Sequence, residues 1–256
     1  MPIIKVNNRA ILAPLFEKNR YDTVLMNSVL EGYFGTACAN SITSPTVARL
    51  DSGAFTILGG DPNAPAVTAL LRYSPIYYVT PENSDWRRVL RAEFGDRLST
   101  LGFTELSSQL LNVNHLLTLT QELADGFKLV KIDELLAERL PSDLNNEYFF
   151  ENFLSIQDFL KRGIGYCILH EGRIVSAATS MAMCDRAIDI EIETAPEFRQ
   201  RGLGTSVGAQ LVLDCLKNGI EPKWLAANIE SEKLAQKLGY VKGDIYETFE
   251  VQHETC

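Results

Sequence analysis

An alternating run of apolar and acidic residues that leads into a glycine-rich turn constrains this chain more than any other segment. Residues 188–194, IDIEIET, put three isoleucines on one face of a strand and three carboxylates on the other, because side chains alternate along a strand. Residues 195–205, APEFRQRGLGT, follow at once. Apolar residues then recur at helical spacing, at Leu203, Val207, Leu211 and Cys215. The sequence therefore predicts a strand, a turn and a helix in immediate succession.

The turn has the chemistry of a phosphate-binding loop. Backbone N–H groups at the start of a helix lack intrahelical partners and carry the positive end of the helix dipole, so they attract anions. Gly202 and Gly204 let the backbone approach a ligand closely, while Arg199 and Arg201 add positive charge. The spacing fits neither GxGxxG nor GxxxxGK[ST], which would need a lysine before Thr205. We therefore expect a phosphate site of another kind and rank an ATP-binding domain last among the hypotheses.

The carboxylates of the predicted strand have two interpretations. Like charges on a water-exposed sheet face repel each other weakly, so this face can simply be solvated. If it lines a partly dry cleft, one carboxylate has a raised pKa and can serve as a general base. Glu191 is the first choice, because it is expected to lie deeper in the strand than the point where neighbouring strands separate. Glu193 comes second, and Asp189 is a weaker third candidate.

Composition excludes several classes of function. The chain has 256 residues, 46% of them hydrophobic, and a net charge of -9, which disfavours nucleic acid as a partner. It contains no apolar run of membrane-spanning length and no secretory signal pattern at its N-terminus. The five cysteines are scattered, and the three histidines have no neighbour at ligand spacing. We expect a protein of the reducing cytoplasm, with no metal site, no membrane and no disulfide framework.

Turn-forming residues are denser in the first half of the sequence than in the second, which predicts two domains, 1–126 and 127–256. The first is rich in turn formers and predicts short strands within 46–58, 65–73 and 76–79, a helix start at Ser84 and a helix over 105–124. The second is more regular. It predicts the following elements in order: helices over 133–139 and 147–161, a hairpin of 165–170 with 173–183, a strand over 187–194, the long helix from 203, a strand over 223–227, a helix over 231–238 and a final strand from 240.

Two segments carry a resemblance to a known family. IETAPEFRQRGLGT, residues 192–205, and ANIESEKLAQKLGYV, residues 227–241, resemble the core of the GNAT superfamily of acyl-coenzyme A N-acyltransferases. The spacing of RGLG and of the run from Pro222 to Tyr240 resembles, more narrowly, the zwittermicin-resistance-like acetyltransferase branch. The resemblance covers roughly residues 127–251. It implies an α+β (α/β) fold, with a mixed, mostly antiparallel twisted sheet flanked by helices, and an N-terminal α+β half that is a partial second copy.

The resemblance also implies roles for individual residues. The main chain from Ile192 to Thr194 would pair with the pantetheine arm and the acetyl carbonyl of acetyl-coenzyme A, where two strands splay apart. The cofactor-binding set would be Ile192, Thr194, Arg199, Gln200, Arg201, Gly202, Leu203, Gly204, Thr205 and Asn228, with residues 200–205 around the diphosphate. Glu191, Glu193 and Ser231 would form the catalytic set.

One position departs from the family pattern. Many members carry a tyrosine in the short last helix that protonates the leaving thiolate, and this chain has Ala235 there. Ser231, Tyr240 and Tyr246 are the nearby hydroxyl groups, and a thiolate also leaves readily near neutral pH. We expect an acetyl-CoA-dependent N-acetyltransferase that moves acetyl directly to a small cationic amine, with an antibiotic as one acceptor type. The alternative from another class is a non-catalytic coenzyme A-binding sensor or interaction module. The sequence leaves open the acceptor, the acyl length, the oligomeric state and the role of residues 1–126.

Overall fold

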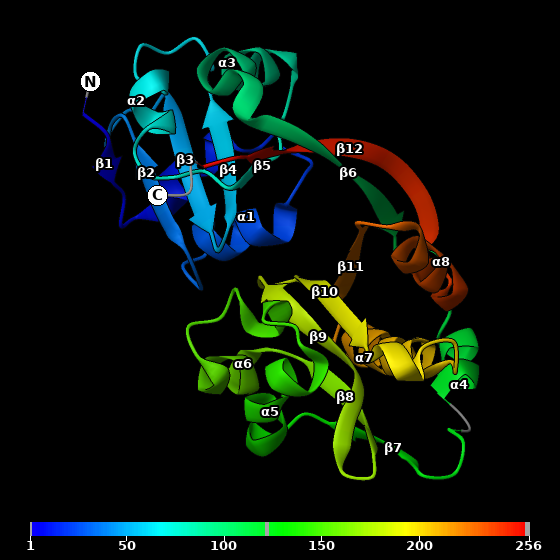
Figure 1. Cartoon of the computed structure of the whole chain (residues 1–256). Coiled ribbons are helices and arrows are strands. Elements are labelled where there is room, and N and C mark those ends of the chain that lie inside the picture. Colours follow the sequence, from blue (N-terminus) through cyan, green and yellow to red (C-terminus); the bar gives the residue numbers. More distant parts are fainter. Residues whose placement is uncertain (1, 121–122, 254–256) are drawn as a thin grey trace. The chain divides into compact units, whose positions relative to one another are not determined.

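The computed structural model describes residues 2–120 and 123–253, and its contacts divide the chain into two compact units (Figure 1). The first unit comprises Met1–Phe103 and Ile245–Cys256, and the second comprises Thr104–Asp244. The chain enters the second unit along β6 (Leu98–Ser107) and leaves it along β12 (Val241–Val251).

The first unit is built on an open sheet with the strand order β1-β2-β3-β4-β5-β12. All neighbours are antiparallel except β4 and β5, which pair in parallel through Phe55 with Tyr78 and Thr56 with Val79. Its elements before β6 are β1 (Ile4–Lys5), η1 (Arg9–Leu15), α1 (Thr23–Leu30), β2 (Thr36–Ala39), β3 (Val47–Ser52), β4 (Phe55–Gly60), α2 (Val67–Leu71), β5 (Tyr78–Val79), α3 (Ser84–Phe94) and η2 (Gly95–Arg97).

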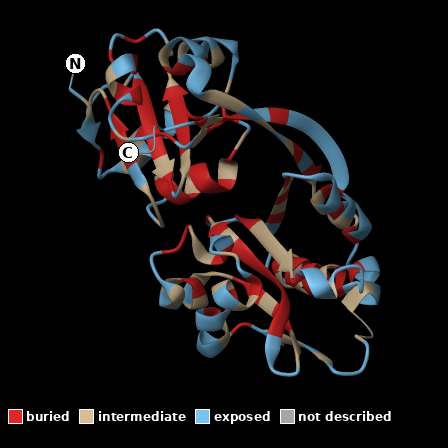
Figure 2. Cartoon of the chain, in the orientation of Figure 1, coloured by how far each residue is buried: buried red, intermediate tan, exposed pale blue. Residues whose placement is uncertain are grey.

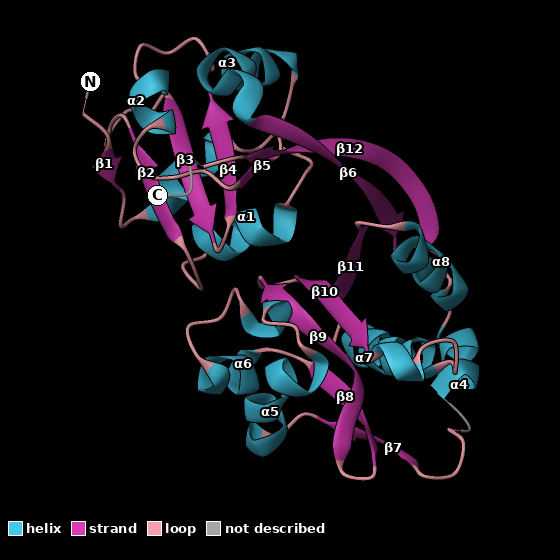
Figure 3. Cartoon of the chain, viewed as in Figure 1, coloured by secondary structure: helices cyan, strands magenta, loops and turns pink. Residues whose placement is uncertain are grey.

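The second unit repeats this plan with the strand order β6-β11-β10-β9-β8-β7. Again one pair of neighbours, β10 and β11, is parallel and the others are antiparallel. Its elements after β6 are α4 (Val113–Thr120), β7 (Phe127–Lys131), α5 (Glu134–Leu144), η3 (Tyr148–Phe150), α6 (Ile156–Arg162), β8 (Gly165–His170), β9 (Arg173–Met183), β10 (Ala187–Thr194), η4 (Pro196–Phe198), α7 (Leu203–Lys217), β11 (Glu221–Ala226) and α8 (Ile229–Leu238), which β12 follows (Figure 3).

The two repeats exchange their last strands. Each runs through a strand, a helical segment, three antiparallel strands, a helix, a strand, a helix and a final strand. The final strand of the first repeat, β6, pairs with β11 in the second unit, through Leu106 and Trp224. The final strand of the second repeat, β12, pairs with β5 in the first unit, through Phe249 and Val79. The predicted mixed, mostly antiparallel α+β fold is thus confirmed, and the N-terminal half has the element order of a second copy.

Helices cover both faces of the second unit's sheet and bury its apolar residues (Figure 2). Leu140 of α5 and Phe149 of η3 pack with Ala177 of β9 on one face, while Val207 and Leu211 of α7 pack on the other. The isoleucines of β10 belong to the α7 face: Ile188 is fully buried there, with Ile190 and Ile192 beside it. The predicted separation of isoleucines from carboxylates along this strand is therefore confirmed.

Three predicted elements are wrong. Residues 65–73 contain the helix α2 rather than a strand, because Leu70 and Leu71 turn into the core as one helical face. Residues 105–124 begin with the end of β6, and α4 starts only at Val113, since Leu106 pairs with a strand far away in sequence. The helix predicted over 147–161 is interrupted, with η3 followed by α6, which begins after the cap Ser155.

The contact-based units also differ from the predicted division at residue 126. Residues 104–120 join the second unit, because the end of β6 extends its sheet and Leu116 of α4 is buried in its core. Residues 245–251 join the first unit, since β12 pairs with β5 there.

Candidate active site

The two central strands of the second unit separate part of the way along. β10 pairs in parallel with β11 over residues 187–189 only, opposite residues 221–223. β10 pairs with β9 from Ile188 to Thr194, so beyond Asp189 it keeps β9 as a partner while β11 pairs with β6 from Trp224 onward. The predicted splay is therefore present and begins at Ile190. Glu191 lies just beyond it rather than deeper in the strand, as the sequence had suggested, and Asp189 is the buried acid before it.

The backbone of β10 faces this opening with two amide groups. Hydrogen-bonded and non-bonded pairs alternate along an antiparallel ladder. The N–H of Ala195 donates to the carbonyl of Val175, which places Glu191 and Glu193 in the bonded pairs with β9. The N–H groups of Ile192 and Thr194 consequently point away from β9, toward the splay.

A helix start with left-handed turn residues follows β10. Gln200 has φ 62° and Gly202 has φ 80°, a region that a side chain disfavours and glycine tolerates. The N–H of Ser206 makes the first bond of the helix, to the Gly202 carbonyl, so the amides of Leu203, Gly204 and Thr205 precede it. A Cβ built at Gly204 would lie 3.3 Å from the Thr194 hydroxyl oxygen, which shows how closely the loop approaches the open strand.

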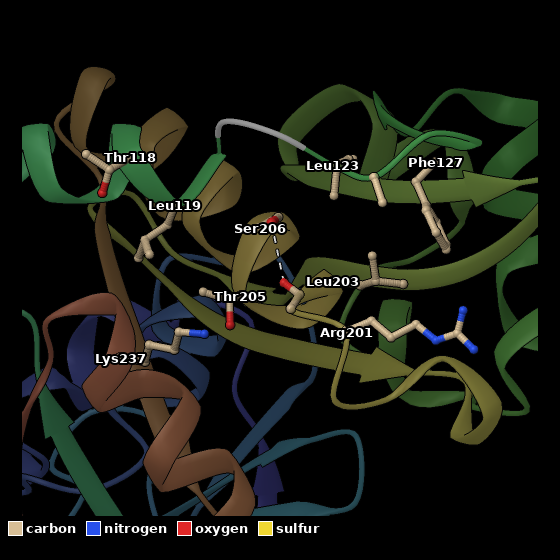
Figure 4. A pocket seen from close by; sticks show the side chains of 11 residues that line it. Thr118, Leu119, Leu123, Phe127, Arg201, Leu203, Thr205, Ser206 and Lys237 are labelled. Carbon is tan, nitrogen blue, oxygen red and sulfur yellow. Dashed lines mark hydrogen bonds between the residues drawn. The ribbon is translucent and has the colours of Figure 1, made fainter.

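A pocket of about 440 Å³ opens at this helix start (Figure 4). One part of its wall is polar and carries the side chains of Arg201, Thr205 and Lys237, the last pointing in from α8. Another part is apolar and comes from α4 and the segment after it. The lining residues are Thr118, Leu119, Leu123, Ala124, Phe127, Arg201, Gly202, Leu203, Thr205, Ser206 and Lys237. A pocket with cations and unbonded amides on one side and apolar groups on the other fits a phosphorylated nucleotide.

Arg199 is held by the strand rather than directed into the pocket. Its Nε donates to the Thr194 carbonyl at 3.0 Å, and its Nη2 donates to the Glu193 carboxylate at 3.0 Å. The same Glu193 oxygen accepts the Thr194 N–H at 2.8 Å. The Glu193 carboxylate therefore already accepts the hydrogen bond of the Thr194 amide, which was predicted to face the acetyl carbonyl. The carboxylate would have to turn away before that amide could bind the carbonyl.

Glu191 is a carboxylate of the site whose surroundings raise its pKa. Burial raises its pKa, and the nearby charges of Glu193 and Glu151 raise it further, while a hydrogen bond from Asn146 lowers it. That bond joins Asn146 Nδ2 to Glu191 Oε1 at 2.7 Å. A raised pKa is what a general base for an amine requires. Asn146 was missed by the sequence analysis, because no local pattern signals a contact across 45 residues of chain.

The polar residues around α8 have structural partners. The Asn228 side chain caps α8 by accepting the Ser231 N–H at 2.9 Å, and the Ser231 hydroxyl accepts the Trp224 indole N–H at 2.9 Å. The Ser231 hydroxyl proton stays available to a further acceptor. Ala235 is fully buried in the core between α8 and the sheet.

The two tyrosine candidates for a general acid are held in place elsewhere. Tyr240 is buried and donates to the Pro222 carbonyl at 2.8 Å, and burial raises its pKa well above the usual value. Tyr246 belongs to the first unit, where its ring packs 4.6 Å from that of Tyr21. Of the three hydroxyl groups, only Ser231 lies on α8 itself.

Two cysteines of the second unit lie in its core. Cys167 and Cys215 are buried, which raises the pKa of each to about 12, so neither is a thiolate near neutral pH. Within residues 2–120 and 123–253 no group of three His, Cys, Asp or Glu side chains is arranged to hold a metal ion. The same residues include no helix long and apolar enough to cross a membrane.

Central strands that separate beside a glycine-rich turn at a helix start are typical of an α+β acyltransferase fold. A family model described as GNAT acetyltransferase matches residues 13–249, so the chain belongs to the GNAT acetyltransferase family.

Relatives of known sequence or structure agree with this assignment. The chain is 30% identical over 157 residues to the uncharacterized N-acetyltransferase YdfB of Bacillus subtilis, a match that covers 60% of this chain and 58% of that relative's length. The GCN5-related N-acetyltransferase-like protein of Streptococcus suis has a TM-score of 0.84 at 29% identity, over 96% of this chain and 98% of that one.

More distant solved structures share the fold. A GCN5-related N-acetyltransferase from Kribbella flavida has a TM-score of 0.62 at 12% identity, covering 92% of this chain and 96% of the other. A tandem GNAT protein from the clavulanic acid biosynthesis pathway has a TM-score of 0.59 at 12% identity, covering 97% and 98%.

Proposed function

We propose that this protein transfers an acetyl group from acetyl-coenzyme A directly to the nitrogen of a small cationic amine. The observation that carries the proposal is the close approach of the turn that lines the pocket to the open part of β10, where a Cβ at Gly204 would lie 3.3 Å from the Thr194 hydroxyl oxygen. The pocket suits the nucleotide and diphosphate end of the donor, and the opening suits a chain that pairs with strand amides. One molecule of acetyl-coenzyme A has both parts.

The binding residues follow from this placement. Amides of the turn from Gln200 to Thr205 would hold the diphosphate, with Arg201 and Lys237 as flanking cations. The amides of Ile192 and Thr194 would face the pantetheine arm and the acetyl carbonyl. Arg199 and Asn228 would support the site from the strand and from the cap of α8, through the contacts described above.

The reaction would proceed in one displacement. Glu191, or a water it polarises, takes a proton from the acceptor amine, and the nitrogen lone pair attacks the thioester carbonyl carbon. A C–N bond forms and the C–S bond breaks, with the electron pair leaving on sulfur. The thiolate then takes a proton from water or from the Ser231 hydroxyl. Strand amides that stabilise the developing oxyanion, and the alignment of both reactants, supply much of the rate.

The acceptor is expected to carry positive charge. Glu191, Glu193 and Glu151 place acidic groups on one side of the open strand, and the chain has a net charge of -9. Such a field attracts a cationic amine and repels an anionic one. A polyamine-like antibiotic is one member of this class, in line with the resemblance to the zwittermicin-resistance-like branch.

A second candidate function, a coenzyme A-binding sensor without turnover, is favoured by Ala235, which stands where many family members have the acid tyrosine. The two functions separate in a thiol-release assay. An enzyme releases free thiol from acetyl-coenzyme A when spermidine or another cationic amine is supplied, whereas a sensor binds the donor and releases none.

Melting curves test the donor site first. Acetyl-coenzyme A and coenzyme A should raise the Tm of the wild type, ATP should not, and Gly202→Asp should lose the shift, because a ligand of the folded state stabilises it by mass action. Gly202→Asn is the matched control: it has the same shape, tolerates the positive φ and adds no charge. No shift with millimolar acetyl-coenzyme A would refute both functions.

A further inference from the structure

The connection between α5 and η3 passes over the carboxylate that the proposed reaction uses as its base. Asn146 lies in this connection, directly after the helix cap Asn145. Its Nδ2 reaches Oε1 of Glu191 at 2.7 Å, although 45 residues separate the two in sequence. Glu151 follows η3 on the same stretch of chain and acts on Glu191 electrostatically.

The Asn146 side chain is fixed at both of its ends. Its Oδ1 accepts the Tyr148 N–H at 2.8 Å, so the amide group is oriented with Nδ2 toward Glu191. Its own backbone N–H donates to the Pro141 carbonyl at 3.0 Å, which ties it to the end of α5. An amide oriented in this way can donate to Glu191 but cannot offer it an acceptor.

The segment itself is anchored to the sheet. The Thr179 hydroxyl of β9 donates to the Phe149 carbonyl at 3.1 Å, and the Phe149 side chain is fully buried. In the register of the two strands, Thr179 stands opposite Glu191. The connection between α5 and η3 is thus bonded to β9 through Thr179 and to β10 through Glu191.

The arrangement distinguishes the two oxygens of Glu191. Oε1 accepts the Asn146 hydrogen bond, whereas Oε2 accepts none from residues 2–120 or 123–253. The charged groups that act on the carboxylate are Glu193 from its own strand and Glu151 from the connection, and Glu193 is itself paired with Arg199. β9 contributes only the neutral Thr179 at this position.

We propose that Asn146 is a positioning residue that holds Oε1 of Glu191, so that Oε2 is presented to the acceptor amine. This inference rests on the proposed function. The donor bond favours the charged carboxylate, while burial and the two neighbouring acids disfavour it, so Asn146 keeps the base ionised at a pH where its surroundings alone would protonate it.

The test compares variants that change Glu191 in opposite directions. Asn146→Ser keeps a side-chain acceptor for the Tyr148 N–H but is too short to reach Glu191, and Asn146→Leu removes both contacts. Each should lower kcat/KM for the amine and move the acidic limb of its pH profile upward by about one unit. Glu151→Gln removes a like charge and should move that limb downward. Asn145→Gly is the matched control, since it keeps the left-handed cap without touching Glu191.

A second readout does not depend on turnover. The carboxyl carbon of Glu191, identified in a 13C-glutamate-labelled sample by its loss in Glu191→Gln, should titrate at higher pH in Asn146→Ser than in wild type. Transfer that persists in Asn146→Ser with an unchanged pH profile and an unchanged carbon titration would overturn the inference. If no amine is acetylated but the carbon titration shifts, the contact is real and the proposed function is what fails.

Discussion

The two units of this chain follow one plan of strands and helices but differ at the turn where the second unit has its pocket. In the second unit β10 leads through Arg199 to Gly202 into α7, a helix of 15 residues. In the first unit β4 leads through Asp61 and Pro62 into α2, a helix of 5 residues. There the Asp61 carboxylate already accepts the Asn63 N–H at 2.9 Å, so an acid stands where the other unit offers amides and cations.

The first unit also contains a buried cation whose hydrogen bonds are made within the unit. Arg49 of β3 is buried, and its guanidinium donates to the carbonyls of Ser74 and Pro75, between α2 and β5, and to the Asp51 carboxylate at 2.7 Å. A charge satisfied in this way supports the sheet and leaves nothing for a ligand. The comparison teaches that the repeat preserves the order of strands and helices, whereas the pocket described above depends on one turn and the helix that follows it.

The largest expected effect comes from removing Glu191, the proposed base in the second unit. Glu191→Gln should lower kcat by about 10² to 10⁴-fold, because general base catalysis contributes that much. The control in the first unit is Glu250→Gln, whose single amide oxygen can still accept from Ser99, the closer of the two hydroxyl groups that donate to Glu250. Steady-state kinetics with acetyl-coenzyme A and spermidine would check both. Equal losses in the two variants would contradict the assignment of catalysis to the second unit.

A buried acid in the first unit should affect stability instead. Burial raises the pKa of Asp22 to about 6, so the folded state holds its proton more tightly than the unfolded chain does. The free energy of unfolding should therefore fall as the pH rises from about 4 to about 6 and level off above that range. In Asp22→Asn the decrease in the free energy of unfolding should be smaller than in the wild type by about 3 kcal/mol. Urea unfolding of both proteins at pH 4 and pH 8 would measure it. A pH-independent difference would refute the raised pKa, and kcat should be unchanged.

The number of donor sites tests the comparison directly. Titration calorimetry should find one acetyl-coenzyme A per chain in the wild type and none in Gly202→Asp, with affinity lowered by at least about a hundredfold. A control change in the turn between β4 and α2 of the first unit, Asn63→Asp, should leave affinity and stoichiometry unaltered. A second site in the wild type would show that the first unit binds the donor despite Asp61.

A smaller effect is expected at the pocket's cation on α8. Lys237→Met should raise the KM for acetyl-coenzyme A by about fivefold at low salt and by less at high salt, since an exposed charge is screened. Lys233→Met, on the same helix but outside the pocket lining, is the control. An equal effect in both variants would assign the change to net charge alone.

Much of the second unit could be predicted from sequence because its signals are local. The Glu171 and Gly172 turn predicts the hairpin of β8 and β9, the alternation of residues 188–194 predicts β10, and Gly239 marks the end of α8. The signal of the glycine-rich turn is equally local, and the pocket is lined by Gly202 of this turn.

The remaining features depend on distant contacts. Leu106 lies in a strand because Trp224 pairs with it, and nothing near residue 106 favours that over the helix we predicted. Asn146 and Lys237 approach the site from elements on either side of it, and in the sequence they look like an ordinary helix end and a surface lysine. The roles predicted for individual catalytic and cofactor-binding residues remain predictions.

Because the two repeats exchange their last strands, the two units are completed at different times during synthesis. The ribosome completes residues 1–103 early, yet the sheet they form keeps β5 as an open edge until residues 249–250 have emerged. The second unit receives β6 before its other strands exist, so β11 finds its neighbour already made when it is synthesised. The first unit is therefore synthesised first but completed last. A chain truncated a few residues short of Val251 would leave the first unit, not the second, without the strand that pairs with β5.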